Sequence, residues 1–169
     1  GGVIPACGTF FVFSDYMKPA VRMAALMELP VKFIWTHDAF RVGEDGPTHE
    51  PVEQEAQIRL MEKLRNHSGL DSVRVFRPCD GHATTECWRI AMENMSTPTA
   101  LIFSRQNVND LPGDRIAESK KASKGAYIVK ACQGTPDIVM IANGSEVSTL
   151  FEGAKLLEER KNLKIQIVS

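Results

Sequence analysis

The residues best suited to chemistry lie in one polar stretch of the chain. It contains the pair His37-Asp38 and the run Gly43-Glu44-Asp45-Gly46-Pro47-Thr48-His49. Imidazoles can donate, accept or shuttle protons near neutral pH, and acids on a glycine-rich backbone suit a pocket for a polar metabolite. The alternative is a solvated loop in which His49 helps to cap the next helix. The residue types alone favour neither interpretation.

A second candidate is the aromatic series Phe10, Phe13 and Tyr16, whose members are spaced three residues apart. If the chain becomes helical here, the rings share one side and form a flat, apolar slot for a heteroaromatic ring. Aromatic residues at helical spacing are more often core residues. The spacing by itself therefore favours a structural role.

Arg105, in the sequence Ser104-Arg105-Gln106-Asn107, is the third candidate. Its planar guanidinium could bind a phosphate or carboxylate, although a single arginine in such a place is more often part of a surface ion pair. A metal site is not expected, because His37 and His49 lack the HxxxH spacing or a set of carboxylates at metal-ligand spacing.

The apolar pattern predicts an α/β fold in which a parallel-sheet domain is followed by the first part of a second α/β domain. Ligands bind at the carboxyl ends of parallel strands, so the loops after Thr36, Phe76 and Ser104 are the expected locations. The expected strands are 31–36, 73–76, 99–104, 126–130, 137–142 and 164–168. The expected helices begin at Ser14, near Pro51, at His82 and at Ser145, and the Ser14 side chain can cap the first of them. Residues 106–124 are expected to be a polar linker.

Composition excludes several classes of function. The chain has 20 lysines and arginines against 21 acids, a net charge of -1, so we expect no nucleic-acid or membrane partner. Its apolar runs are far shorter than the roughly 20 residues that span a bilayer. The four cysteines form no CxxC pair and are expected to be reduced in the cytoplasm. The chain has neither an initiator methionine nor a signal sequence, and its last residues alternate like an unfinished strand, so we expect a piece of a longer protein.

The polar stretch resembles the transketolase signature THDxxxxGEDGPTHxPxE, which runs here from Thr36 to Glu53. Further similar segments follow the order of that family, including Gly8-Thr9-Phe10, Arg77-Pro78-Cys79-Asp80 and Ser104-Arg105-Gln106-Asn107. The resemblance implies a pyrimidine-binding domain over residues 1–107, incomplete at its N-terminus, a linker over 108–124, and the start of the C-terminal domain over 125–169. The diphosphate-binding domain of the family is absent.

The resemblance also implies roles for individual residues. Phe10, Phe13 and Tyr16 resemble the aromatic wall that holds the aminopyrimidine of thiamine diphosphate. His49 resembles the histidine that lies beside the thiazolium, hydrogen-bonds oxygens of the donor sugar and assists proton transfer. It is therefore both the catalytic candidate and a substrate-binding one.

Three further residues are implied to bind substrate. His37 and Arg105 resemble the pair that holds the phosphate end of the sugar, and Asp45 resembles the acid that recognises a substrate hydroxyl. A polar contact of this kind rejects analogues that lack the matching group.

The implied reaction transfers a two-carbon ketol unit from a ketose phosphate to an aldose phosphate in the pentose phosphate pathway. It uses thiamine diphosphate and Mg²⁺ in a homodimer, and the metal ligands lie on the absent domain. We therefore expect this chain alone to be inactive. Two alternatives are a dihydroxyacetone synthase, which uses formaldehyde as the acceptor, and a non-catalytic half of a transketolase encoded as two chains.

Overall fold

The computed structural model describes residues 2–39 and 41–169. The chain divides into two compact units, of which the first comprises residues up to 77 together with 88–107. The second comprises residues 78–87 and 108–169.

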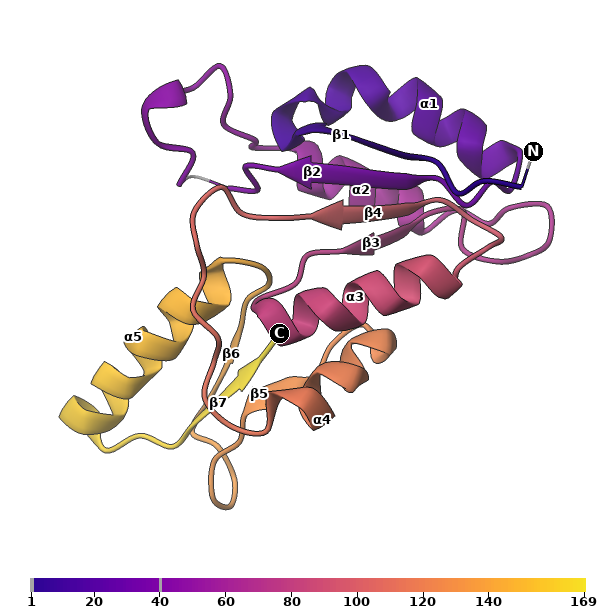
Figure 1. Cartoon of the computed structure of the whole chain (residues 1–169). Coiled ribbons are helices and arrows are strands. Elements are labelled where there is room, and N and C mark those ends of the chain that lie inside the picture. Colours follow the sequence, from indigo (N-terminus) through magenta and orange to yellow (C-terminus); the bar gives the residue numbers. More distant parts are fainter. Residues whose placement is uncertain (1, 40) are drawn as a thin grey trace. The chain divides into compact units, whose positions relative to one another are not determined.

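The first unit is built on a parallel sheet of four strands in the order β1-β2-β4-β3 (Figure 1). Because every strand is followed by a crossover, all four carboxyl ends lie at one edge of the sheet. This sheet confirms the predicted α/β fold. The strands are β1 (Ala6–Phe10), β2 (Lys32–Thr36), β4 (Thr99–Ile102) and β3 (Arg74–Phe76).

Two helices, α1 (Ser14–Leu26) and α2 (Gln54–Glu62), cover one face of this sheet. Alternation along β2 directs Phe33 and Trp35 to this face, where they pack with both helices. The core residues of the two helices are Val21, Ala24, Ala25 and Ile58. Apolar residues at helical spacing on α1 thus form its buried face, as the sequence predicts.

Asn94, the residue that follows α3 (Gly81–Glu93), contacts Lys32 of β2. Lys32 is fully buried, and its Nζ donates a hydrogen bond of 2.8 Å to the carbonyl oxygen of Asn94. The side-chain amide of Asn94 in turn donates to the hydroxyl of Thr99 on β4. These hydrogen bonds compensate for the free-energy cost of burying the polar groups of Lys32, Asn94 and Thr99.

The second unit contains a smaller sheet in the order β5-β7-β6. Its β6 runs parallel to β7, whereas β5 is antiparallel to β7. The core is formed by Val147 and Ala154 of α5 and by Ile165 and Ile167 of β7. The elements are α4 (Arg115–Ser119), η3 (Lys120–Lys124), β5 (Ile128–Lys130), β6 (Ile138–Ile141), α5 (Glu146–Lys161) and β7 (Ile165–Val168).

Three local features differ from the sequence-based expectations. The strand β1 is not predicted, because residues 8–16 read as the approach to a helix. Ser14 is the first residue of α1 and makes no capping bond to it. The segment 108–124, expected to be a linker, contains α4 and η3, and Arg115 of α4 forms a buried ion pair with Asp80, with Nε and Oδ2 3.0 Å apart.

Candidate functional site

The predicted site residues of the first unit gather at the carboxyl edge of the four-stranded sheet. Phe10 is the last residue of β1, His37 directly follows β2, and Arg105 lies shortly after β4. This is the edge at which parallel sheets bind ligands. The connection after β2, which contains the short helix η2 (Gly43–Asp45), completes the site.

The aromatic wall forms where β1 passes into α1 through the turn η1 (Phe11–Phe13). The rings of Phe10 and Phe13 stack with centroids 6.1 Å apart, and Phe13 and Tyr16 are separated by the same distance. Phe11 points the other way, is fully buried and stacks on Trp35. The three predicted rings therefore share one side, and Tyr16 is 83% exposed.

The two histidines contact this wall. His37 stacks on Phe10 with ring centroids 3.6 Å apart and an interplanar angle of 23°. His49 lies edge-on to Phe10 and Phe13, at centroid distances of 5.8 and 5.3 Å. The structure thus brings the aromatic series and the polar connection into one site, although they are remote in sequence.

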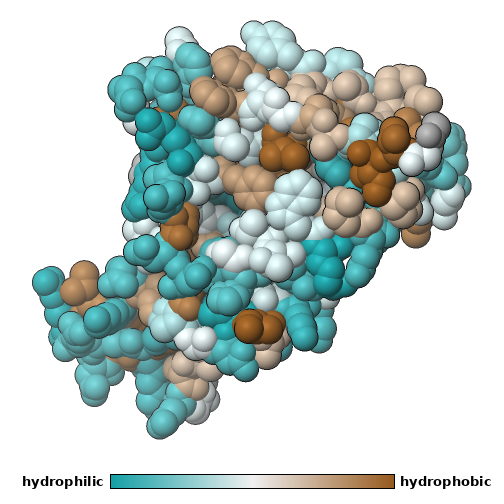
Figure 2. Space-filling model, viewed as in Figure 1, coloured by the Kyte–Doolittle hydropathy of each residue, from teal (hydrophilic) through white to brown (hydrophobic). Residues whose placement is uncertain are grey.

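Asp45 lies between two potential cations. Its Oδ2 is 3.9 Å from both Nε2 of His37 and Nε of Arg105. Nη2 of Arg105 also donates to Glu44 at 3.2 Å. Gly43, with a φ of 85°, allows the turn that places these acids beside the guanidinium. Hydrophilic side chains cover this connection in Figure 2.

The environment of His37 favours the neutral imidazole. Burial lowers its pKa from 6.5, the nearby charge of Arg105 lowers it further, and the carboxylate of Asp45 opposes the shift. His37 also has a φ of 62°, an uncommon backbone conformation that is found at functional sites. A neutral imidazole retains one donor and one acceptor.

Each histidine is held by the threonine that precedes it. Oγ1 of Thr36 lies 2.9 Å from Nδ1 of His37, and Oγ1 of Thr48 lies 2.8 Å from Nδ1 of His49. The Thr48 hydroxyl is also 3.4 Å from the carbonyl oxygen of Asp45, to which it donates. Neither threonine is among the predicted site residues, although the repeated Thr-His pair is a signal for both in the sequence.

Asp38 does not belong to this cluster, although it is adjacent to His37 in sequence. It is buried and forms an ion pair of 2.8 Å with Arg77, which also contacts Glu55 at 3.2 Å. Arg77 follows β3, and Glu55 belongs to α2. The carboxylate therefore anchors the connection after β2 to two other elements.

Across residues 2–39 and 41–169, no group of three histidine, cysteine or acidic side chains is arranged to hold a metal ion. Within the same residues, no helix is both long and apolar enough to cross a membrane. The four cysteines are free thiols. The site consequently offers aromatic surface, two imidazoles, a carboxylate and a guanidinium.

The first unit is thus a parallel α/β domain in which aromatic rings and two histidines meet at the carboxyl edge of the sheet. The family model described as "Transketolase, pyrimidine binding domain" matches residues 1–110. A second model, "Transketolase-like TK C-terminal domain", matches residues 125–169. The chain belongs to the transketolase family.

Curated relatives support this membership. The chain is 46% identical over 171 residues to a transketolase of Staphylococcus aureus strain MW2 and 46% identical over 173 residues to one of Bacillus subtilis strain 168. Each alignment covers 100% of this chain and 24% of the relative. The chain thus spans about a quarter of the length of these relatives.

Solved structures agree. A transketolase of Leishmania mexicana matches with a TM-score of 0.84 and 38% identity, over 99% of this chain and 23% of that chain. A Pichia stipitis transketolase in complex with sedoheptulose 7-phosphate matches with a TM-score of 0.82 and 38% identity, over 97% and 22% of the two chains. An inactive β4 tetramer of a split-gene transketolase shares the fold, with 24% identity and a TM-score of 0.67. The match covers 99% of this chain and 49% of that chain.

Proposed function

We propose that this chain is the pyrimidine-binding part of a transketolase, which transfers a two-carbon ketol unit between ketose and aldose phosphates with thiamine diphosphate. The observation that carries the proposal is the position of His49, edge-on to Phe10 and Phe13. It places a proton-handling group directly against the surface that would hold the cofactor ring.

The aromatic wall fits the aminopyrimidine of thiamine diphosphate. Phe13 and Tyr16 form a surface of which the tyrosine is largely exposed, so a flat ring can pack on it by offset stacking. When bound, the cofactor supplies the chemistry that breaks and forms the carbon–carbon bond, and the protein supplies binding and orientation.

His49 is proposed to handle protons at the substrate oxygens. The Thr48 hydroxyl donates to the carbonyl of Asp45, so its oxygen can accept the Nδ1 proton of His49. This arrangement leaves Nε2 as an acceptor. A neutral imidazole of this kind can take a proton from a sugar hydroxyl and later return it.

His37, Asp45 and Arg105 are proposed to hold the sugar phosphate. Arg105 is 39% exposed at its side chain and is paired mainly with the solvated Glu44, a contact worth little in water. A phosphate can therefore take its place with bidentate, charge-assisted bonds. The neighbouring Asp45 would accept a hydrogen bond from a substrate hydroxyl. The Pichia stipitis complexes with sedoheptulose 7-phosphate and fructose 6-phosphate support this class of ligand.

Other parts of the proposal concern the whole protein. We propose, as the family resemblance implies, that the ligands for Mg²⁺ belong to the diphosphate-binding domain of a longer protein. A homodimer would complete the site, and the free cysteines are compatible with a cytoplasmic location. The chain alone would then show no ketol transfer and little affinity for the cofactor.

The sharpest test is a chimaera in which this chain replaces the matching 171 residues of the Staphylococcus aureus transketolase. We expect ketol transfer from a ketose phosphate to ribose 5-phosphate in a coupled assay. His49→Ala in the chimaera should lower kcat about 100-fold or more, the usual range for a lost acid–base group. Turnover by the isolated chain, or a folded chimaera that binds the cofactor without transfer, would contradict the proposal.

The same chimaera separates the two possible acceptors. If His37 and Arg105 bind the phosphate of the acceptor, Arg105→Gln should raise KM for ribose 5-phosphate and leave KM for formaldehyde unchanged. A preference for formaldehyde that does not depend on Arg105 would favour a dihydroxyacetone synthase instead. Circular dichroism of each variant serves as the control for folding.

A further inference from the structure

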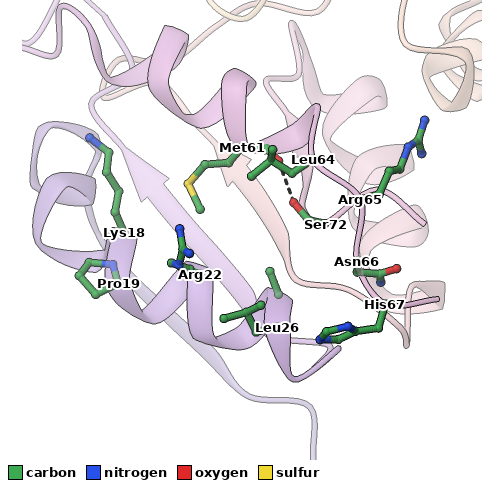
Figure 3. A pocket seen from close by; sticks show the side chains of 11 residues that line it. Lys18, Pro19, Arg22, Leu26, Met61, Leu64, Arg65, Asn66, His67 and Ser72 are labelled. Carbon is green, nitrogen blue, oxygen red and sulfur yellow. Dashed lines mark hydrogen bonds between the residues drawn. The ribbon is translucent and has the colours of Figure 1, made fainter. Parts of the chain in front are cut away.

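A groove of about 530 Å³ lies in the first unit and is lined by none of the predicted site residues (Figure 3). Its wall on one side is α1, and on the other it is Met61 of α2 and the segment that follows this helix. We propose that this groove binds a small amphipathic organic anion, in which an anionic head is attached to an apolar body. This ligand site is independent of the proposed ketol transfer.

The floor of the groove is apolar. Ala25 and Leu26 line it from α1, and Met61 and Leu64 line it from the opposite side. Met61 packs on the core of the unit, whereas Leu26 and Leu64 are 47% and 56% exposed. A ligand that covers these two leucines removes apolar surface from water, which favours binding.

The rim of the groove is basic. Its lining contains Lys18, Arg22, Arg65 and His67, and no aspartate or glutamate. Asp15 compensates Lys18, Asp71 compensates Arg65, and the carboxylate of Glu28 interacts with His67. Within the described part of the chain, Arg22 has neither a hydrogen bond nor an ion pair. The unpaired guanidinium gives the groove its preference for a negative charge.

The position of Arg22 connects the charge to the apolar floor. It lies one helical turn before Leu26 on α1, and Figure 3 shows its side chain directed into the space between α1 and Met61. An anionic head bound to Arg22 would therefore place an attached apolar body over Leu26 and Leu64.

The remaining polar groups contribute less to recognition. The Ser72 hydroxyl donates to the carbonyl of Met61, and Oδ1 of Asn66 accepts from the backbone of Leu70. Nδ2 of Asn66 is buried and has no hydrogen-bond partner. It therefore adds a hydrogen-bond donor to the lining, but no further acceptor. The lining thus selects for negative and acceptor-rich heads.

The size of the groove fits a small molecule, because pockets for such ligands span about 300–1,000 Å³. Octanoate is a suitable probe, since it combines a carboxylate with a flexible apolar chain. Two comparison ligands separate its properties: 1-octanol has the chain without the charge, and acetate has the charge without the chain.

We would titrate the whole 169-residue chain with each ligand by calorimetry and by amide NMR. Octanoate should bind at one site and shift the amide signals of Arg22, Leu26 and Leu64. Octanol should bind about tenfold more weakly, and acetate should show no saturable binding. Arg22→Gln should weaken octanoate binding about tenfold, as expected for a lost charge-assisted hydrogen bond, and leave octanol binding unchanged.

Arg160→Gln, on the exposed surface of α5 in the other unit, is the matched control and should not change binding. Leu64→Trp, which fills the groove from an exposed position, should abolish the binding of octanoate and octanol. The proposal is overturned if octanoate and octanol bind equally to wild type and to Arg22→Gln. It is also overturned if octanoate shifts signals elsewhere, or if only an acidic peptide binds.

Discussion

The two charges that act most strongly on the pKa of His37, those of Asp45 and Arg105, can each be removed by a single substitution. Burial and Arg105 lower its pKa below 6.5, and Asp45 acts against them. Asp45→Asn should therefore lower the NMR titration midpoint of His37 further, and Arg105→Gln should raise it. Shifts of both variants in the same direction would contradict the proposed electrostatic arrangement.

The same pKa shift has a consequence for stability. Because the folded chain takes up the His37 proton at a lower pH than the unfolded chain, the unfolded state binds more protons just below pH 6.5. The contribution of neutral His37 to the free energy of unfolding should be complete above pH 6.5. It should decline as the pH falls toward the pKa that His37 has in the folded chain. His37→Gln should flatten this dependence in urea unfolding measured between pH 5 and 7.5.

We expect the hydroxyl of Thr48, 2.8 Å from Nδ1, to select the tautomer of His49. If the Thr48 oxygen accepts the Nδ1 proton, ¹⁵N NMR should show His49 protonated on Nδ1 at neutral pH. Thr48→Val removes the acceptor and should shift the proton to Nε2, whereas Thr48→Ser should preserve it. If the ¹⁵N chemical shifts of His49 did not change in Thr48→Val, Thr48 would not be the acceptor for the Nδ1 proton. In the chimaera, Thr48→Val should lower kcat more than it changes KM.

The site residues could be named from the sequence, but their contacts could not. The signature identifies His37 and His49 by type and order, and no spacing rule predicts that His37 stacks on Phe10. The shared side of Phe10 and Phe13 was inferred from a helical spacing. In the structure it arises because β1 ends at Phe10 and a 3₁₀ turn precedes α1. Their roles in binding remain predictions.

At the scale of elements, the sequence-based predictions fail where an element depends on long-range contacts. The strand β1 is short and contains Gly8, where an added Cβ would lie 2.8 Å from the carbonyl oxygen of Ile34 on β2. Its identity depends on this pairing and not on an alternating pattern. Polar composition likewise conceals α4, because Arg115 finds its partner 35 residues away at Asp80.

The Arg115–Asp80 pair should make α4 essential to the stability of the second unit. The two side chains are 2% and 0% exposed, and Oδ1 of Asp80 also accepts from the backbone of Ala83 near the start of α3. Arg115→Met leaves a buried carboxylate unpaired and should lower the free energy of unfolding by about 3–5 kcal/mol. Urea unfolding followed by circular dichroism measures the change.

Two variants control this prediction. Arg65→Met removes an exposed pair with Asp71 and should cost less than about 1 kcal/mol. Asp80→Asn combined with Arg115→Met removes the unpaired charge and should recover part of the loss. A single Arg115→Met variant as stable as Arg65→Met would show that α4 is not anchored by this pair.

At the scale of the molecule, one face of α1 has no covering partner among the described residues. Tyr16, Ala20, Met23 and Met27 are all exposed and follow one another at spacings of four, three and four, so they form a continuous stripe. Figure 2 shows apolar side chains gathered over this helix. The stripe is continuous with the aromatic wall, since Tyr16 belongs to both.

Exposed apolar stripes of this kind commonly form interfaces, so we expect the isolated chain to self-associate through α1. Met23→Lys would place a charge in the interface and should raise the dissociation constant about tenfold or more in sedimentation velocity experiments. Met92→Lys is the matched control, because Met92 is 47% exposed on α3 and Met23 is 53% exposed on α1. If both variants weaken association equally, or if the chain stays monomeric at high concentration, α1 is not the contact surface of the isolated chain.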